Sequence, residues 1–283
     1  MTGANRPPAS RHNAPAPVII TSPQNPKVKQ ARELRNTNRR RREKRMLVEG
    51  AKHIMQALTA EVCPRQCFYV PERLHEYDHK VLIEMESRGA ELIATTARVL
   101  ETLADTESPQ PLIAVMEHPA EQGPATFREG GLVLIADQLK DPGNAGVLLR
   151  TAAAAGAAVV MTGGAVDITN PKVFRASAGL LFSVSLWTGA EVPEVTEAAR
   201  RAGYRLLLCD SRGAKPYYVV DMKPATAIII GSEAHGPSHL WSEAADEVVH
   251  IPMAGEAESL NASVAAAVVL YEALRQRRQA TTC

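Results

Sequence analysis

Three short segments combine polar side chains with small residues, and each begins where an apolar run ends. They are DQLKDPGNAGVLLRTAAAAG (137–156), IIIGSEAHGPS (228–238) and IPMAGEAESLNASVAAAVVLYEAL (251–274). In open parallel sheets, ligands bind in the loops beyond the carboxyl ends of the strands. If the apolar runs are parallel strands, the polar residues that follow them converge on one candidate site.

Each polar side chain in these segments also has a structural interpretation when it is taken alone. Asn144 is suited to cap a helix, and Ser259 and Asn261 are equally common capping residues. Arg150 lies among apolar residues, so it is either a surface residue or a buried group held by anions. Glu233 could be an exposed acid on a turn between a strand and a helix. The residue types alone leave these alternatives open.

Other site signatures find little support. None of the three segments contains the G-x-G-x-x-G dinucleotide fingerprint or a P-loop, so a nicotinamide enzyme or an NTPase is not indicated. The cysteines and histidines at positions 63, 67, 75 and 79 form C-x3-C-x7-H-x3-H. A C2H2 zinc finger has about twelve residues in the middle, so we interpret these four residues as scattered core and surface positions and expect no metal.

The order of apolar runs and helical stretches predicts two α/β domains. An RNA-substrate domain is expected at 18–118, a linker rich in Pro, Gly and polar residues at 119–130, and the domain that carries the three segments at 131–283. Continuous apolar strands alternating with helices are typical of a parallel sheet covered on both faces. Residues 1–17, rich in Pro, Ala and Asn, are expected to form a disordered tail.

Composition narrows the compartment. The 283 residues are 45% hydrophobic, which is enough for a substantial core. No apolar run approaches the roughly 18–20 residues that cross a bilayer, and the first residues lack the apolar stretch of a secretory signal. The four cysteines are too few and too irregularly spaced for a disulfide framework. We therefore expect a cytoplasmic protein without a membrane partner.

Charge is concentrated near the N-terminus. The chain has a net charge of only +1, but residues 25–45 hold ten Lys and Arg against two Glu. A basic amphipathic helix is expected to begin after Pro26. Such a block supplies phosphate affinity that does not depend on sequence, although a solvated helix face is the alternative. The residues expected to contact RNA are Arg39, Arg40, Arg41, Arg42, Lys44 and Arg45.

In their order and wording, the three segments resemble the motifs of the SpoU/TrmH family in the SPOUT superfamily. The stretch NPKVKQARELRN…RRRREKRMLVEGAKHIMQAL resembles that family's N-terminal substrate-binding domain, and the whole resemblance covers roughly residues 20–275. It implies a C-terminal trefoil-knotted α/β domain with a parallel sheet, and a small N-terminal α/β domain that binds RNA. It also implies S-adenosylmethionine as cofactor and a homodimer, which the small-residue helix expected from about 260 to 277 favours independently.

Roles for individual residues follow from this resemblance. Asn144 and Arg150 match the catalytic Asn and Arg, Glu233 the acid of the second motif, and Ser259 and Asn261 the polar pair of the third. The positions that match cofactor-binding residues are Gly231, Ile251, Met253 and Leu260.

The reaction implied is methylation of a ribose 2'-hydroxyl group in RNA. Arginine is a poor proton acceptor because the guanidinium keeps its charge at neutral pH. We therefore expect Arg150 to grip a phosphate and stabilise the developing alkoxide, with Asn144 orienting Arg150 or the hydroxyl group.

The target RNA is less defined than the reaction. The two-domain layout favours 23S rRNA, and relatives with this layout include enzymes that confer resistance to ribosome-targeting antibiotics. The alternatives are a non-catalytic RNA-binding protein that kept the fold, and a tRNA ribose or base methyltransferase.

Overall fold

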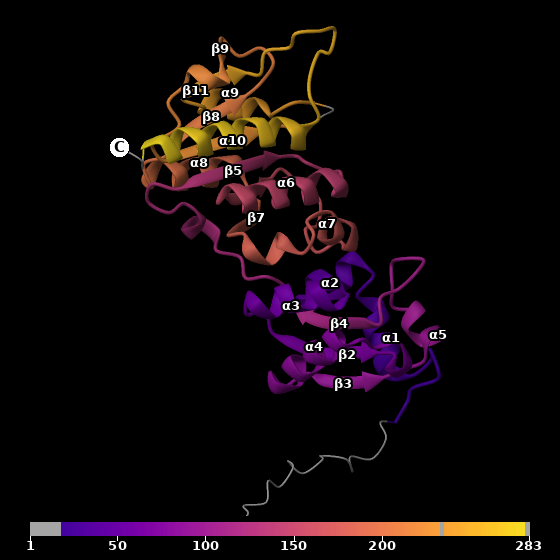
Figure 1. Ribbon diagram of the computed structural model, residues 1–283. Helices are drawn as coiled ribbons and strands as arrows, with labels where there is room; N and C mark the ends of the chain where they lie inside the picture. The colour runs from indigo at the N-terminus through magenta and orange to yellow at the C-terminus, as the bar shows by residue number, and fades with distance from the viewer. Residues whose placement is uncertain (1–17, 233–234, 281–283) are drawn as a thin grey trace, which may run out of the picture.

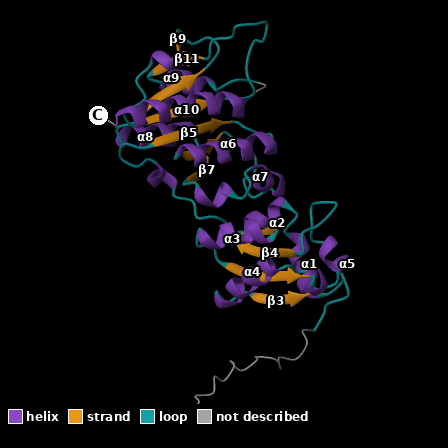
Figure 2. Ribbon diagram, viewed as in Figure 1, coloured by secondary structure: helices purple, strands orange, loops and turns teal. Residues whose placement is uncertain are grey.

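The computed structural model describes residues 18–232 and 235–280, and Figure 1 shows two sheet-containing units joined through the segment before β5. The predicted tail at 1–17 lies outside the described residues. Strands and helices alternate in both units (Figure 2), which confirms the predicted α/β class. None of the described helices is both long and apolar enough to cross a bilayer.

The first unit is built on a four-stranded sheet with the order β1-β4-β2-β3, in which β2 and β3 are parallel and the other pairs antiparallel. Its strands are β1 (Arg45–Glu49), β2 (Pro64–Tyr69), β3 (Glu91–Ala94) and β4 (Leu112–Glu117). One face packs against α1 (Pro26–Glu33) and α5 (Ala97–Glu101). The other face packs against α3 (Ala51–Thr59) and α4 (Glu76–Ser87). The basic helix α2 (Thr37–Glu43) leads into β1.

The second unit is built on a seven-stranded, entirely parallel sheet with the order β7-β6-β5-β10-β8-β11-β9. Its strands are β5 (Leu132–Asp137), β6 (Ala158–Thr162), β7 (Leu186–Ala190), β8 (Arg205–Cys209), β9 (Lys215–Pro216), β10 (Thr226–Ile230) and β11 (Glu247–His250). Every residue of β5 and β10 is buried, as expected for central strands covered on both faces.

Helices cover both faces of this sheet. The faces carry α6 (Pro142–Ala155), α7 (Pro171–Ala176) and α10 (Ala262–Ala280) on one side, and α8 (Val192–Arg201) and α9 (His239–Ala244) on the other. The predicted long C-terminal helix is therefore confirmed as α10, and it packs along α6.

Helix α6 starts earlier than the sequence predicted. Its N-cap is Asp141, whose carboxylate accepts a hydrogen bond from the Asn144 backbone amide at 2.8 Å, with Pro142 in the first turn. The prediction that Asn144 caps the helix is therefore wrong. Asn144 lies inside the first turn, where its side chain is not needed for capping. Gly156, with φ of +70°, ends the helix as predicted.

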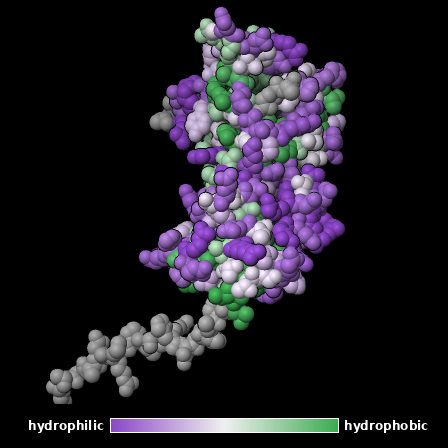
Figure 3. Space-filling model, turned by 90° about the vertical axis from the view of Figure 1, so that its right-hand side faces the viewer, coloured by the Kyte–Doolittle hydropathy of each residue, from purple (hydrophilic) through white to green (hydrophobic). Residues whose placement is uncertain are grey.

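The segment predicted as a linker, 119–130, runs against the second unit. Glu121 accepts hydrogen bonds from the backbone amide and the hydroxyl of Thr188, at 2.9 and 2.7 Å, and Phe127 is buried beside Tyr204. The two units also contact each other directly, since the rings of His53 in α3 and Phe174 in α7 lie 5.1 Å apart. Figure 3 shows mainly hydrophilic side chains over the region where the two units meet.

Candidate active site

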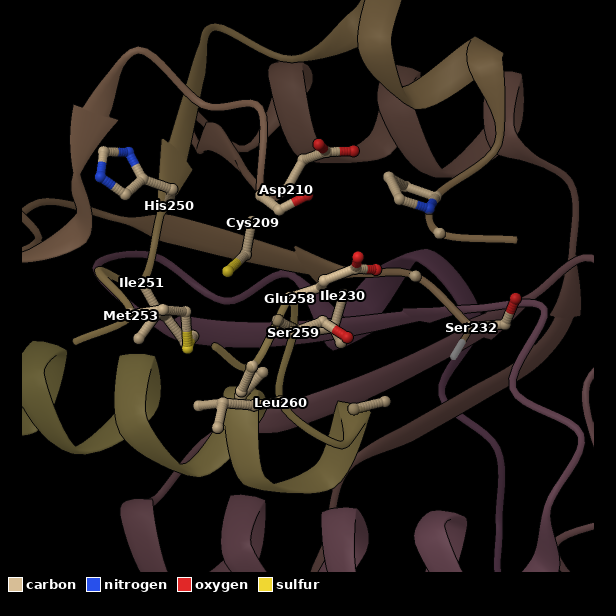
Figure 4. Close-up of a pocket in the computed structure, with 17 residues that line it drawn as sticks. Cys209, Asp210, Ile230, Ser232, His250, Ile251, Met253, Glu258, Ser259 and Leu260 are labelled. Atoms are coloured by element: carbon tan, nitrogen blue, oxygen red, sulfur yellow. The ribbon is translucent and has the colours of Figure 1, made fainter. Parts of the chain in front are cut away.

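A cavity of about 510 Å3 opens at the carboxyl ends of β8, β10 and β11. Figure 4 shows Cys209 and Asp210 on one side of it, and Ser259 and Leu260, just before α10, on the other. All four predicted cofactor positions, Gly231, Ile251, Met253 and Leu260, line this cavity, together with Ser259. Topology explains the convergence, because the carboxyl ends of parallel strands lie at one edge of the sheet.

The backbone shapes one wall of the cavity. A Cβ atom on Gly231 would lie 2.0 Å from the Pro237 nitrogen and 2.2 Å from the Gly236 carbonyl carbon, so only glycine allows this close approach. Ser232, the next residue, has a buried hydroxyl oxygen with no hydrogen-bond partner among the described residues. A small, folded-back loop with an unsatisfied hydroxyl is suited to hold a polar ligand against the backbone.

Charge in the cavity favours a cationic ligand. The described lining contains two carboxylates, Asp210 and Glu258, and neither lysine nor arginine. Hydrogen bonds from Arg212 hold the pKa of Asp210 below its ordinary value, against the opposing effect of burial. Burial, reinforced by Asp210, raises the pKa of the neighbouring Cys209 thiol to about 11, so the thiol stays neutral at pH 7. A phosphate-rich nucleotide would find no basic side chain here.

Beside the cavity, Asn144 from the first motif meets Asn261 from the third. The Asn261 side-chain oxygen accepts hydrogen bonds from the Ser263 amide at 3.0 Å and from the Ser263 hydroxyl at 2.7 Å, and so caps α10. Its amide nitrogen donates to the Asn144 side-chain oxygen at 3.0 Å. Capping thus fixes which end of Asn261 faces Asn144, and the structural and the site interpretations of Asn261 hold together.

The remaining predicted residues are less closely gathered. Arg150 is exposed on α6 and does not line the cavity. It lies six residues after Asn144, a rise of roughly 9 Å along the helix. Glu233 lies outside the described residues.

Asp137, at the end of β5, was not predicted as a site residue. Its carboxylate is fully buried, accepts a hydrogen bond from the Ser238 amide at 2.7 Å and another from the Thr162 hydroxyl at 2.8 Å. It thereby ties the loop of the second motif to two strand ends. A lone acid closing an otherwise apolar strand was the signal in the sequence.

The six predicted RNA contacts divide into different environments. Arg41, Arg42 and Lys44 are exposed and make no ion pair with another described residue, and Arg45 is half-buried. Arg39 forms ion pairs with Glu33 and Glu43. Arg40 is only 2% exposed, so the prediction that it contacts RNA phosphates is wrong.

No group of three or more His, Cys, Asp or Glu among the residues the structure describes could hold a metal ion. Of the residues weighed for zinc, Cys67 is fully buried, whereas Cys63 is exposed.

Comparison with known proteins agrees with the geometry. The SpoU rRNA Methylase family matches residues 131–271, and the MRM3-like substrate binding domain matches residues 25–114. A 23S rRNA (uridine(2479)-2'-O)-methyltransferase from Streptomyces viridochromogenes is 36% identical over 88% of this chain and 90% of its own length. The 23S rRNA (guanosine(2553)-2'-O)-methyltransferase RlmP from Bacillus subtilis is 30% identical over 89% and 97%.

Two solved structures extend the comparison to the fold. The SpoU methyltransferase AviRb from Streptomyces viridochromogenes, in complex with the cofactor AdoMet, superposes with a TM-score of 0.83 at 35% identity, covering 90% of this chain and 99% of that one. An AdoMet-bound rRNA methyltransferase from Sinorhizobium meliloti gives a TM-score of 0.83 at 26% identity, over 91% and 97%. The protein described here belongs to the SpoU rRNA methylase family.

Proposed function

We propose that this protein transfers a methyl group from S-adenosylmethionine to the 2'-hydroxyl group of a ribose in 23S rRNA. The observation that carries the proposal is the Asn144–Asn261 pair beside a cavity lined by carboxylates. The Streptomyces and Bacillus relatives, named as 23S rRNA 2'-O-methyltransferases, support the substrate. The two AdoMet-bound neighbours support the cofactor.

The cavity fits this cofactor on its own chemistry. Its volume of about 510 Å3 is within the roughly 300–1,000 Å3 of small-molecule sites. Asp210 and Glu258 complement a ligand that carries positive charge on a sulfonium and an ammonium group. Gly231, Ile251 and Leu260 supply backbone and apolar surface for the adenosine. The cofactor supplies an electrophilic methyl group for in-line displacement.

The protein contributes positioning and electrostatics. Asn261 is held by its capping bonds and holds Asn144, which orients the ribose hydroxyl group. Arg150 binds the phosphate next to that ribose and stabilises negative charge on the 2'-oxygen, and the proton passes to phosphate or solvent. Glu233 fixes the arginine or a loop amide.

The exposure of Arg150 is consistent with a site completed by a second subunit. Val147, on the same face of α6, is 43% exposed, and on α10 Val264 is 47% and Tyr271 50% exposed. Burying these apolar side chains would favour a homodimer through α6 and α10. Sedimentation should show a dimer at micromolar concentration, and an active monomer would refute this arrangement.

Two further expectations are part of the proposal. Family membership supports a trefoil knot in the unit that contains the cavity, with 18–118 as the RNA-binding domain. Pulling the chain by its termini should then leave an unfolded polymer shorter than its contour length, because a knot tightens instead of opening. The cytoplasmic location follows from the rRNA substrate, and locating a tagged chain by cell fractionation tests it.

The deciding experiment maps 2'-O-methyl groups on rRNA from cells with and without the gene, and on naked transcripts methylated in vitro. A single gene-dependent site in 23S rRNA is expected. Methylation of tRNA, or of a base nitrogen, would replace the proposed substrate, and cofactor binding without any transfer would indicate a non-catalytic protein. Comparing antibiotic susceptibility of the same strains tests the predicted resistance role.

Arg150→Ala tests the mechanism. It should retain affinity for S-adenosylmethionine and lose at least about 100-fold in methyl transfer, because its interaction belongs to the transition state. Calorimetry and a transfer assay measure the two effects, with Arg201→Ala as a control in an exposed ion pair with Glu197. Equal loss of cofactor binding would show that Arg150 is structural.

A further inference from the structure

A buried arginine connects the two units. All five guanidinium N–H groups of Arg40 are engaged. Within its own unit it donates to the carbonyl oxygens of Leu34 and Arg35, at 3.1 and 2.9 Å, and to the Thr37 hydroxyl at 3.0 Å. Across the boundary it reaches two residues of the loop between β6 and α7, which fixes the angle between the units at this point.

Those two residues are Asp167 and Thr169. Arg40 donates to the Asp167 carboxylate at 2.7 Å and to the Thr169 hydroxyl at 3.2 Å. The Thr169 hydroxyl donates in turn to Asp167 at 2.6 Å. Burial raises the pKa of Asp167, but hydrogen bonds from Thr169 and Arg40 outweigh it and hold the pKa below its ordinary value. Asp167 is therefore ionised at neutral pH, and the buried pair has no unmatched charge.

The loop that holds Asp167 is itself attached to the candidate active site. The Val166 amide donates to the Leu139 carbonyl oxygen at 2.9 Å, in the loop that leads to α6 and Asn144. After the loop, α7 packs tightly on α6, since a Cβ atom on Gly146 would lie 2.4 Å from that of Ala176. A short chain of contacts thus runs from Arg40 to the helix that carries Asn144 and Arg150. Figure 1 shows α2 and α7 facing each other where the units meet.

The same contact determines where the exposed cations lie. Arg41, Lys44 and Arg45 line a cleft of about 820 Å3 whose opposite wall includes Asp167, Thr169 and Gly189. Gly164 and Gly189 follow or end β6 and β7, so the cleft lies at the carboxyl edge of the sheet, the edge that carries the cavity. A phosphate backbone bound by these cations would be directed toward that edge.

We propose that Arg40 is a positioning residue, which locks the basic segment 41–45 against the catalytic unit so that bound RNA reaches Asn144 and Arg150 in register. This inference rests on the proposed function. It assigns neighbouring arginines different tasks: Arg41 binds RNA, whereas Arg40 holds the surface on which RNA is bound.

The test compares Arg40→Lys with Arg41→Gln in steady-state methylation of a 23S rRNA fragment. Lysine keeps the charge of Arg40 but cannot serve its spread of acceptors. We expect Arg40→Lys to raise KM for RNA at least about tenfold, because two linked binding surfaces no longer act together. Its kcat should stay within about twofold, and the slope of log K against log salt should not change, because every phosphate-binding cation remains. Arg41→Gln should instead reduce that slope by about one.

Three further measurements separate positioning from folding. Asp167→Asn, which leaves Arg40 in place, should reproduce the rise in KM, and the double variant Arg40→Lys/Asp167→Asn should add little to either single change. Arg201→Gln, in an exposed ion pair, should change nothing. Destabilisation alone would lower kcat by removing active molecules while KM stayed constant, and that result would overturn the proposal, as would an unchanged KM. Failure of the wild type to methylate RNA would instead refute the proposed function.

Discussion

The cavity and the basic segment differ in how they assign roles to neighbouring residues. At the cavity, residues far apart in sequence come together because each follows a parallel strand that ends at the same edge. In the basic segment, residues of one type lie next to each other and have separate roles. Arg39 is paired with acids, Arg40 is buried between the two units, and Arg41 is exposed.

Geometry accounts for the contrast. Successive residues of a helix point about 100° apart, so four consecutive arginines cannot share one surface. The residues after parallel strands share an edge whatever lies between them. A charge run therefore predicts a binding region but not its members, whereas a motif at a strand end predicts both.

The first prediction tests the role of backbone shape in the cavity, and its expected effect is the largest. Gly231→Ala places a Cβ atom 2.0 Å from the Pro237 nitrogen, so the loop of the second motif must shift. We expect affinity for S-adenosylmethionine to fall at least about 100-fold, with activity falling in parallel, because the wall is backbone and cannot rotate away. Titration calorimetry measures the loss.

Gly255→Ala is the matched control for Gly231→Ala. It changes a glycine in the loop before α10, where a Cβ atom meets nothing within 4 Å. Its cofactor affinity should equal that of the wild type. If Gly231→Ala also binds normally, the close approach is a packing detail and the cavity tolerates a wider loop.

Much of this architecture was predictable. Apolar runs marked β5 and β10 as strands buried on both faces, and the motifs placed Gly231, Ile251, Met253, Leu260 and Ser259 at one cavity. Two features were not predictable. Whether Asp141 or Asn144 caps α6 depends on where the turn after β5 ends, since both residue types cap equally well. The burial of Arg40 depends on Asp167, 127 residues away, which no local pattern could reveal.

The second prediction separates the two roles of Asn261. Asn261→Asp keeps the oxygen that caps α10 but removes the donor to Asn144, whereas Asn261→Ala removes both. The alanine variant should lose about 1 kcal/mol of unfolding free energy and the aspartate variant much less. Both should lose activity, by about 100-fold if the oriented pair acts as one preorganised donor.

Denaturant unfolding and single-turnover methylation of the same samples measure these effects. Full activity of Asn261→Asp would show that the contact with Asn144 is dispensable, and that the third motif serves α10 alone. Ser263→Ala removes the hydroxyl donor to Asn261 while leaving the contact with Asn144, and so reports the contribution of capping by itself.

The last prediction concerns the basic segment, where each contribution is small because the charges are exposed. Replacing Arg41, Arg42 and Lys44 together with Gln should lower the slope of log K against log salt by about two to three, in proportion to the phosphates released. Arg39→Gln should change it less, since Glu33 and Glu43 already neutralise that side chain. Cofactor affinity and melting temperature should stay the same in both variants, because none of the three replaced residues is buried. Filter binding to an rRNA fragment across salt concentrations gives the slopes. A triple variant with an unchanged slope would show that the exposed cations are a solvated helix face, and that RNA is bound elsewhere on the molecule.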